Sequence, residues 1–383
     1  MTDTADTTDD TGELAIAAAA ETDETDVAEP DTLRDYARMV YVRIRSGDSG
    51  VLPVVAGLVL ISILFQSLNS NFLSAGNLVN LLVQGAAYML LAMGEVFALL
   101  LGEIDLSIGF VSGIGGILTA EMVKQGWNWP WWAAVLVALL ACAAIGAIQG
   151  TIITRIGLPS FVVTLAGLLG WQGVMLLILG NGGSLPINNK VVNDFTAGNL
   201  TPVASWIVMI LIVAVLGVRA WVHEGRRRSS GLVAPPVSLT VLKIAAYAAS
   251  GIVLVLICNT NRGRLIPIRG VPWVVLIVLG VLATYTFLLR RTKFGRYVYA
   301  IGGNAEAARR AGVSLARIRT ICFMLASFTA GSAGSSTPHD YSRSLRRSRA
   351  AHSSSTRWPR QLSVGRACSA AGARRYTRCS AAS

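Results

Sequence analysis

Long apolar runs are the feature that most constrains how this 383-residue chain folds. A helix that crosses a bilayer needs about 20 mostly apolar residues, and lipid offers its backbone no hydrogen-bond partner outside the helix. Only 14% of the residues are charged, against about 25% in soluble domains. The sequence therefore predicts an all-α polytopic membrane protein with about nine transmembrane helices. They are expected at 51–68, 78–101, 106–123, 131–153, 160–180, 203–220, 238–258, 272–289 and 316–331.

Lysine and arginine are unevenly distributed over the connections between these segments. If the N-terminus is cytoplasmic, eighteen bases before residue 332 fall on the cytoplasmic side and five on the outer side. Cytoplasmic loops carry an excess of Lys and Arg, so we expect a cytoplasmic N-terminus. Four tryptophans between Trp127 and Trp132 fall at an expected outer loop, as in an aromatic interface belt. The loop "NRGRLIPIRG", at 261–270, fits this topology least well because it places three arginines outside.

Both ends of the chain are polar. Residues 1–33 hold eleven acids and no base, which is typical of a disordered arm, and a basic juxtamembrane segment follows at 34–50. Residues 332–383 hold ten arginines, no lysine and a single acid, Asp340, and so carry +9 of the net charge of +12. We favour an out-of-frame origin for this tail, because the last apolar run breaks off within its pattern. The alternative is a functional basic tail that binds anionic lipid or nucleic acid.

Small residues recur within the apolar runs at spacings that let helices approach closely. Gly109 and Gly113 lie four residues apart, as do Gly146 and Gly150, while Gly167, Gly170 and Gly173 recur every three residues. Such spacings are typical of helix–helix packing in membranes. We expect ordinary bundle packing at these glycines rather than a gate.

No pattern in the chain predicts a catalytic or a metal site. The five cysteines lack CxxC spacing and histidine partners, and no GxxxxGK[ST] sequence is present. The three histidines lie outside the apolar runs. We therefore expect no catalytic residue, no metal and no cofactor in this chain.

The stretch "LLLGEIDLSIGF" places Glu103 and Asp105 in a short turn between two apolar runs. The favoured interpretation is that these acids form the turn and cap the next helix by accepting backbone N–H groups. A cation or proton pathway is the alternative, because acids within membrane segments are often functional. Glu95, deeper in the preceding run, is the one other acid placed to face the bundle interior.

The last long loop, 290–320, holds eight bases and one acid and is too polar to cross a membrane. Asn304 is expected to cap a short helix over "AEAARRA", and Gly312 to end it. Glu306 and Arg310 lie four residues apart on that helix, a spacing that favours an ion pair. Two interpretations remain open: a helix that docks into a soluble partner, or a solvated loop without one.

Three segments resemble, in order, the permease subunits of ATP-binding-cassette sugar importers of the ribose and xylose type. They are "GEIDLSIGFVSGIGG", "LPSFVVTLAGLLGWQG" and "FGRYVYAIGGNAEAARRAGV". The resemblance covers about 50–331 and implies a transmembrane permease domain at 51–331. The extra apolar segment and arginine-rich loop at about 219–270 are similar to the longer xylose-type members. Further spans and a glycine-rich segment, which follow in the family, are not found after Gly331.

The resemblance implies a transport subunit without enzymatic activity, in the plasma membrane of a prokaryote. A separate ATPase subunit would hold ATP and magnesium, a second permease copy would complete a homodimer, and an extracytoplasmic binding protein would deliver xylose or a similar sugar. No nucleic-acid partner is implied. A secondary transporter or channel, a scaffold protein and a non-functional permease fragment are the alternatives. The coupling loop would be carried by Gly303, Asn304, Glu306, Arg309, Arg310 and Gly312, and the signature motif by Gly102, Glu103, Asp105, Leu106, Ser107 and Gly109.

Overall fold

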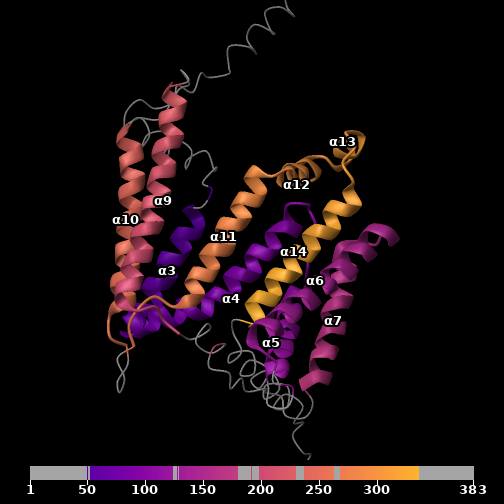
Figure 1. Ribbon diagram of the computed structural model, residues 1–383, viewed down its shortest axis with the longest axis horizontal. Coiled ribbons are helices and arrows are strands. Elements are labelled where there is room, and N and C mark those ends of the chain that lie inside the picture. The colour runs from indigo at the N-terminus through magenta and orange to yellow at the C-terminus, as the bar shows by residue number, and fades with distance from the viewer. Residues whose placement is uncertain are drawn as a thin grey trace, which may run out of the picture. The chain divides into compact units, whose positions relative to one another are not determined.

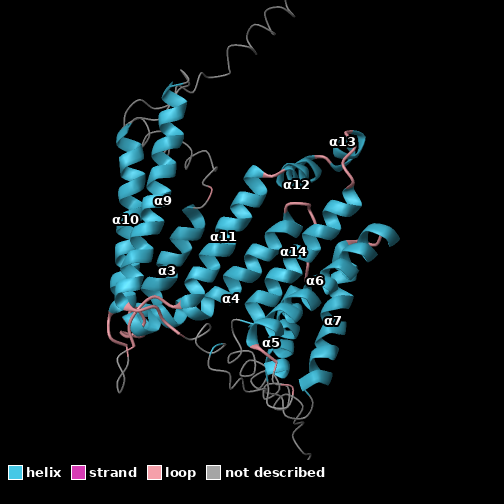
Figure 2. Ribbon diagram, in the orientation of Figure 1, coloured by secondary structure: helices cyan, strands magenta, loops and turns pink. Residues whose placement is uncertain are grey.

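The computed structural model describes residues 50, 52–123, 127, 129–179, 191, 198–229, 237–262 and 268–335. Within these ranges the regular structure is α-helical (Figures 1 and 2), and one isolated bridge pairs Asn199 with Pro272. The contacts divide the chain into unit 1, Met1–Leu78 with Leu200–Val271, and unit 2, Val79–Asn199 with Pro272–Ser383. The acidic arm, residues 34–49 of the basic juxtamembrane segment and the tail from residue 336 lie outside the described residues.

The two units differ in the number of helices they hold. Unit 1 contains α3 (Leu52–Leu68), α9 (Pro202–Ser229) and α10 (Val237–Asn259), together with the start of α4 (Ala75–Leu99). Unit 2 contains the rest of α4, α5 (Ile108–Val123), α6 (Trp131–Ile156), α7 (Ser160–Leu179), α11 (Trp273–Arg291), α12 (Lys293–Gly303), α13 (Ala305–Arg310) and α14 (Leu315–Ser335).

Six of the described helices are long and apolar enough to cross a membrane: α4, α6, α7, α9, α10 and α11. This confirms a polytopic helical membrane protein, but it does not reach the expected nine spans. The apolar helices α3 and α5, with 17 and 16 residues, are shorter than these six. Helix α14 has 21 residues and extends four residues beyond the expected end at 331, but bases interrupt its first turns at Arg317 and Arg319.

Helix α14 is the centre of unit 2, where it packs mainly against α6 and α5 (Figure 1). The two helices approach closely because glycines of α6 face α14. A Cβ on Gly146 would lie 2.3 Å from the Phe323 carbonyl oxygen, and one on Gly150 would lie 2.8 Å from the Thr320 Cα. The expected close approach is therefore confirmed for this pair.

Three other glycines in the expected spacings face no other helix within the part of the chain that the structure describes. A Cβ on Gly109, Gly170 or Gly173 would meet nothing within 4 Å. In the triplet of helix α7, only Gly167 is closely covered, since a Cβ there would lie 2.3 Å from the Gln149 Nε2. Spacing alone thus did not show which of these glycines meets another helix of the described chain, because it does not say which face of a helix meets a neighbour.

In unit 1, α9 and α10 pack together as a helical hairpin. Buried Glu224 on α9 accepts a hydrogen bond from the Thr240 hydroxyl on α10 and pairs with Lys243 at 3.4 Å. At the other end of α10, the Arg262 Nη2 donates to the Gly270 carbonyl oxygen at 3.0 Å. One of the arginines that fit the expected topology least well therefore has a structural role in holding its own loop.

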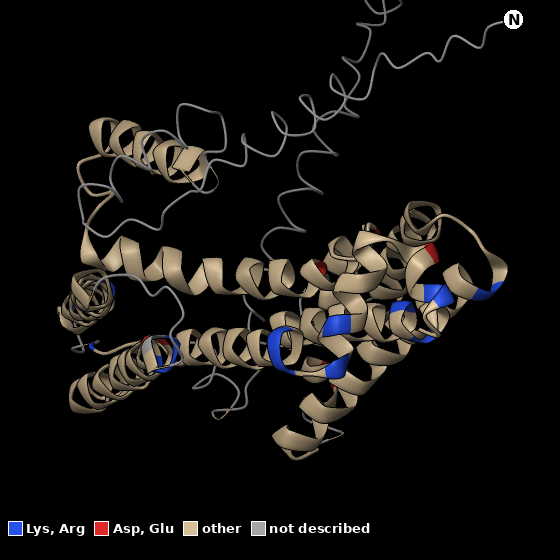
Figure 3. Cartoon of the chain, turned by 90° about the horizontal axis from the view of Figure 1, so that it is seen from above, with Lys and Arg blue, Asp and Glu red and all other residues tan. Residues whose placement is uncertain are grey.

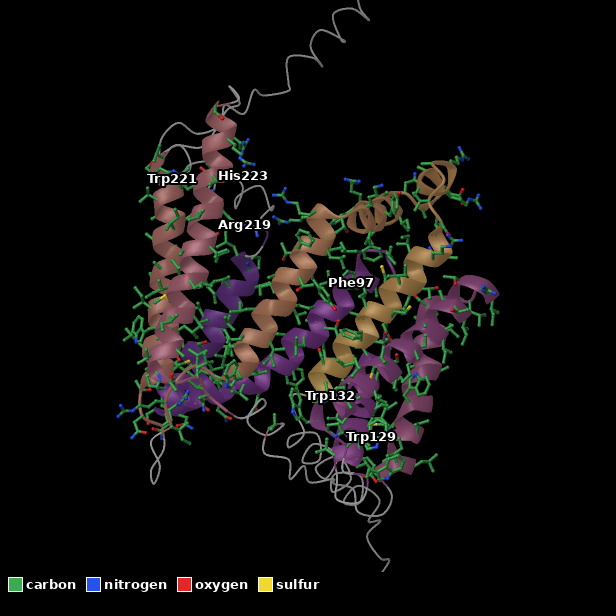
Figure 4. All side chains as sticks on the ribbon, viewed as in Figure 1. Phe97, Trp129, Trp132, Arg219, Trp221 and His223 are labelled. Atoms are coloured by element: carbon green, nitrogen blue, oxygen red, sulfur yellow. The ribbon has the colours of Figure 1, made fainter. Side chains whose placement is uncertain are left out.

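The two ends of unit 2 differ in character. Helices α12 and α13 and the α4–α5 turn share one end, which is also the end of Phe97 on α4 (Figures 1 and 4). Trp129 and Trp132, before and within the first turn of α6, lie at the opposite end (Figure 4). The two tryptophans are 39% and 58% exposed, as expected of side chains at a membrane interface.

Candidate coupling surface and signature turn

The loop after α11 is more ordered than its polarity predicts. Thr292 separates α11 from α12: its Oγ1 accepts from the Gly295 N–H at 3.3 Å and donates to the Leu288 carbonyl oxygen at 2.5 Å. Helix α12 then buries Val298 and Ile301. We did not predict this helix, although the spacing of Phe294, Val298 and Ile301 is the signal that would have indicated it.

The short helix α13 forms as the sequence predicts. The Asn304 Oδ1 accepts a hydrogen bond from the Ala307 N–H at 3.0 Å, as an N-cap should. Gly312 has φ +82°, and its N–H donates to the Arg309 carbonyl oxygen, which ends the helix. A left-handed residue at this position favours glycine, since a Cβ would be strained there.

Helix α13 has one buried residue and a charged outer face. Ala308 is 5% exposed and packs with Val298, Ile301 and Ile318 in a hydrophobic cluster. The residues expected to contact a partner are all exposed: Gly303, Asn304, Glu306, Arg309, Arg310 and Gly312. Glu306 pairs with Arg309 at 2.8 Å rather than with Arg310, so the expected i,i+4 pair is replaced by an i,i+3 pair.

Positive charge dominates the surface around α13. Figure 3 looks onto this end of unit 2 and shows Lys and Arg gathered over α12, α13 and the start of α14. We call the exposed bases together with Glu306 the coupling surface. Its bases are Arg290, Arg291, Lys293, Arg296, Arg309, Arg310 and Arg317. A surface of this charge is suited to binding an acidic partner surface.

The signature turn joins α4 to α5, and Asp105 organises it. The Asp105 side chain is 3% exposed, and its Oδ1 accepts from the Ser107 N–H at 2.9 Å and from the Ser107 Oγ at 2.6 Å. Burial raises the pKa of the Asp105 carboxyl, and the hydrogen bonds from Ser107 partly oppose that rise. These bonds agree with the turn-and-cap interpretation of Asp105.

The turn is tied to three helices besides its own α5. The Asp105 N–H donates to the Glu95 Oε1 on α4 at 3.0 Å. The Ser107 Oγ lies 2.9 Å from the Gln149 Nε2 on α6, which donates to it. On α7, the Thr164 Oγ1 donates to the Ile104 carbonyl oxygen at 3.1 Å. Glu95, the acid expected deep in the bundle, therefore acts as an acceptor for the turn.

Glu103 points in another direction and contacts α14. Its Oε1 lies 3.3 Å from the Arg319 Nε, with the two side chains 13% and 29% exposed. The other motif residues are simpler: Gly102 has φ +73°, Leu106 is 43% exposed, and Gly109 is half-buried. Gln149, Ser160 and Thr164 belong to the same site but were missed, although polar residues inside apolar runs are a usable signal.

Comparisons with known proteins agree on one kind of relative. A family profile described as "Branched-chain amino acid transport system / permease component" matches residues 77–342. The xylose transport system permease protein XylH of Escherichia coli (strain K12) is 32% identical over 278 residues, covering 72% of this chain and 68% of the relative. No solved structure matches.

Two further relatives come from the same strain. Its ribose import permease protein RbsC is 28% identical over 281 residues, which is 73% of this chain and 66% of the relative. Its D-allose transport system permease protein AlsC is 25% identical over 278 residues, which is 72% of this chain and 64% of the relative.

Proposed function

This chain belongs to the permease-component family of transport systems, and from that premise we propose that it is the membrane-spanning subunit of an ATP-driven monosaccharide importer. Xylose or a similar sugar is the proposed substrate, because a xylose permease is 32% identical to this chain. The chain itself performs no covalent chemistry in this proposal. A separate ATPase subunit binds ATP and magnesium. When that ATPase closes, the permease changes the side of the membrane from which its sugar site is accessible.

The coupling surface is the observation that carries this proposal. Helix α13 is capped at Asn304, ended at Gly312 and anchored by buried Ala308, so its position is defined at three points. It carries Glu306, Arg309 and Arg310 outward on a basic surface. A short helix held in this way can be displaced by a moving partner and remain folded. We assign the docking of the ATPase subunit to this surface.

Orientation and the other partners follow from the same proposal. An ATPase works in the cytoplasm, so the coupling surface is cytoplasmic, and the tryptophan end of unit 2 faces outward. This agrees with a cytoplasmic N-terminus in the plasma membrane of a prokaryote. A second copy of the chain and an extracytoplasmic sugar-binding protein complete the proposed assembly.

The secondary-transporter alternative is the weaker one. A proton-coupled transporter needs acids that are available within the spans. Glu95, the acid best placed for such a role, accepts the Asp105 N–H, which gives it a structural function. That structural role of Glu95 weakens the alternative.

Purification and uptake test the proposed function together. We expect the full chain to co-purify with an ATPase subunit, and proteoliposomes of that complex to take up labelled xylose when ATP and the sugar-binding protein are supplied. Glu306→Lys and deletion of 304–312 should abolish ATP-driven uptake while membrane insertion remains.

The control is Arg226→Glu, which reverses one charge, as Glu306→Lys does, at an exposed site on α9. Full ATP-driven uptake by the deletion variant would refute the assignment.

A further inference from the structure

The coupling surface is built on a hydrophobic cluster that includes the end of α4. Phe97 and Leu101, at and just beyond the last turn of α4, pack with Val298 and Ile301 of α12, Ala308 of α13, and Ile318 and Cys322 of α14. All seven side chains are at most 8% exposed. Because a close-packed cluster transmits displacement rather than absorbing it, α13 and the end of α4 move together.

Two further contacts connect the same segment to the signature turn. Gly302 on α12 lies against the turn so closely that a Cβ there would be 2.0 Å from the Leu100 carbonyl oxygen. The second contact is the ion pair between Glu103 in the turn and Arg319 on α14, at 3.3 Å. Since both members of this pair are largely shielded from water, their attraction is screened less than that of the exposed pair between Glu306 and Arg309.

The signature turn in turn reaches α6 and α7 through buried polar contacts. Ser107 is fully buried. Its Oγ accepts a hydrogen bond from the Gln149 Nε2 on α6 at 2.9 Å and donates one to the Asp105 Oδ1 at 2.6 Å. On α7, Ser160 accepts from the Ile104 N–H at 3.4 Å and Thr164 donates to the Ile104 carbonyl oxygen at 3.1 Å. These bonds have fixed directions, so displacing the turn displaces the ends of both helices.

We propose that Glu103 and Arg319 are positioning residues that fasten the signature turn to the coupling segment, so that movement of α13 reaches α6 and α7 through the turn. The inference rests on the proposed function and assigns the motif a role within it. The ion pair supplies the lateral connection between α14 and the turn, and the Gly302 contact supplies the connection from α12. Neutralising one member of the pair leaves the docking surface intact and weakens the transmission of its movement.

The experiment measures sugar taken up per ATP hydrolysed, in proteoliposomes of the full chain with its ATPase subunit. We expect Glu103→Gln and Arg319→Gln to lower this ratio about two- to thirty-fold, the range found for residues that carry coupling between sites. ATPase binding should be unchanged, because neither residue lies on the exposed face of α13. Exchanging the charges, with Glu103→Arg and Arg319→Glu together, should restore part of the ratio.

The control is Lys243→Gln, which breaks an ion pair of similar length, 3.4 Å, on the α9–α10 hairpin. Its uptake per ATP should match that of the unmodified chain. Arg319→Lys keeps the charge but not the planar guanidinium, and should lie between the unmodified chain and Arg319→Gln.

The outcomes separate this inference from the function on which it rests. If the unmodified chain gives no ATP-driven uptake, the proposed function is refuted and this inference with it. If the unmodified chain transports, and Glu103→Gln and Arg319→Gln keep its uptake per ATP, the inference alone is refuted. Should the glutamine variants fail to assemble, an unaltered ratio in Arg319→Lys would overturn it equally.

Discussion

Replacing Gly146 by alanine tests whether α14 is held against α6 by the absence of a side chain. The new Cβ would lie 2.3 Å from the Phe323 carbonyl oxygen and 2.7 Å from the Ser327 Oγ, whereas ordinary contact begins at 3.4 Å. The serine hydroxyl can rotate away, but the carbonyl is backbone, so the helices must separate locally by about 1 Å. Overpacking of this kind costs about 1–3 kcal/mol. At about 2 kcal/mol, and with an unfolding entropy of about 2 cal/mol/K for each of the 383 residues, the melting temperature should fall by roughly 2–3 °C.

The assay is thermal unfolding of the purified full chain in detergent, followed by the loss of the monodisperse peak in size-exclusion chromatography. Gly170→Ala on α7 is the matched control, because a Cβ at Gly170 would meet nothing within 4 Å. Both variants gain the same intrinsic helix propensity, about 1 kcal/mol, so their difference isolates the contact. If Gly146→Ala melts at or above the temperature of Gly170→Ala, the close approach of α6 and α14 is wrong.

Three further predictions concern the cap, the buried acid and the tail. Asn304→Ala should cost α13 about 1 kcal/mol, seen as about five-fold faster amide exchange at 305–310, with Asn304→Ser close to the unmodified chain. Burial raises the pKa of Asp105, so the folded state holds its proton more tightly than the unfolded state does, and stability should rise as the pH falls through the folded-state pKa. Asp105→Asn should remove this component from melting temperatures measured as the pH is lowered from neutral toward the ordinary Asp pKa of about 4, and an identical pH dependence in both proteins would contradict it. Sequencing the gene across the codon for Gly331 should reveal apolar spans in another frame, whereas stop codons in both other frames would refute an out-of-frame tail.

Local features of the structure could be predicted because their causes lie within a few residues. The cap at Asn304 joins atoms three residues apart, and the end of α13 requires only that Gly312 adopt a positive φ. Asp105 and Ser107 are two residues apart, and the hydrogen bond between them is local to the turn. The apolar runs likewise predict helices, because a backbone in lipid must satisfy its hydrogen bonds internally.

Features that depend on the partner helix could not be predicted in this way. Glu306 has arginines three and four residues away, and which one it pairs with depends on side-chain direction once Ala308 faces the core. Gly146 and Gly170 look equivalent in the sequence, yet only Gly146 faces another backbone. Helix α12 was missed because its apolar face is narrow and most of its remaining residues are polar or small.

The sequence by itself determined that this chain is helical and polytopic, where its charged loop would form a capped helix, and which family of permeases it resembles. Only the tertiary structure decided what the signature motif contacts. Its partners Gln149, Ser160 and Thr164 lie 42 to 60 residues away from the positions they bind. The ion pair between Glu103 and Arg319 likewise joins the signature turn to α14, a helix far from the turn in the sequence. Apolar periodicity records that a helix is buried in lipid or protein, but the choice of neighbour comes from packing the whole set of helices together.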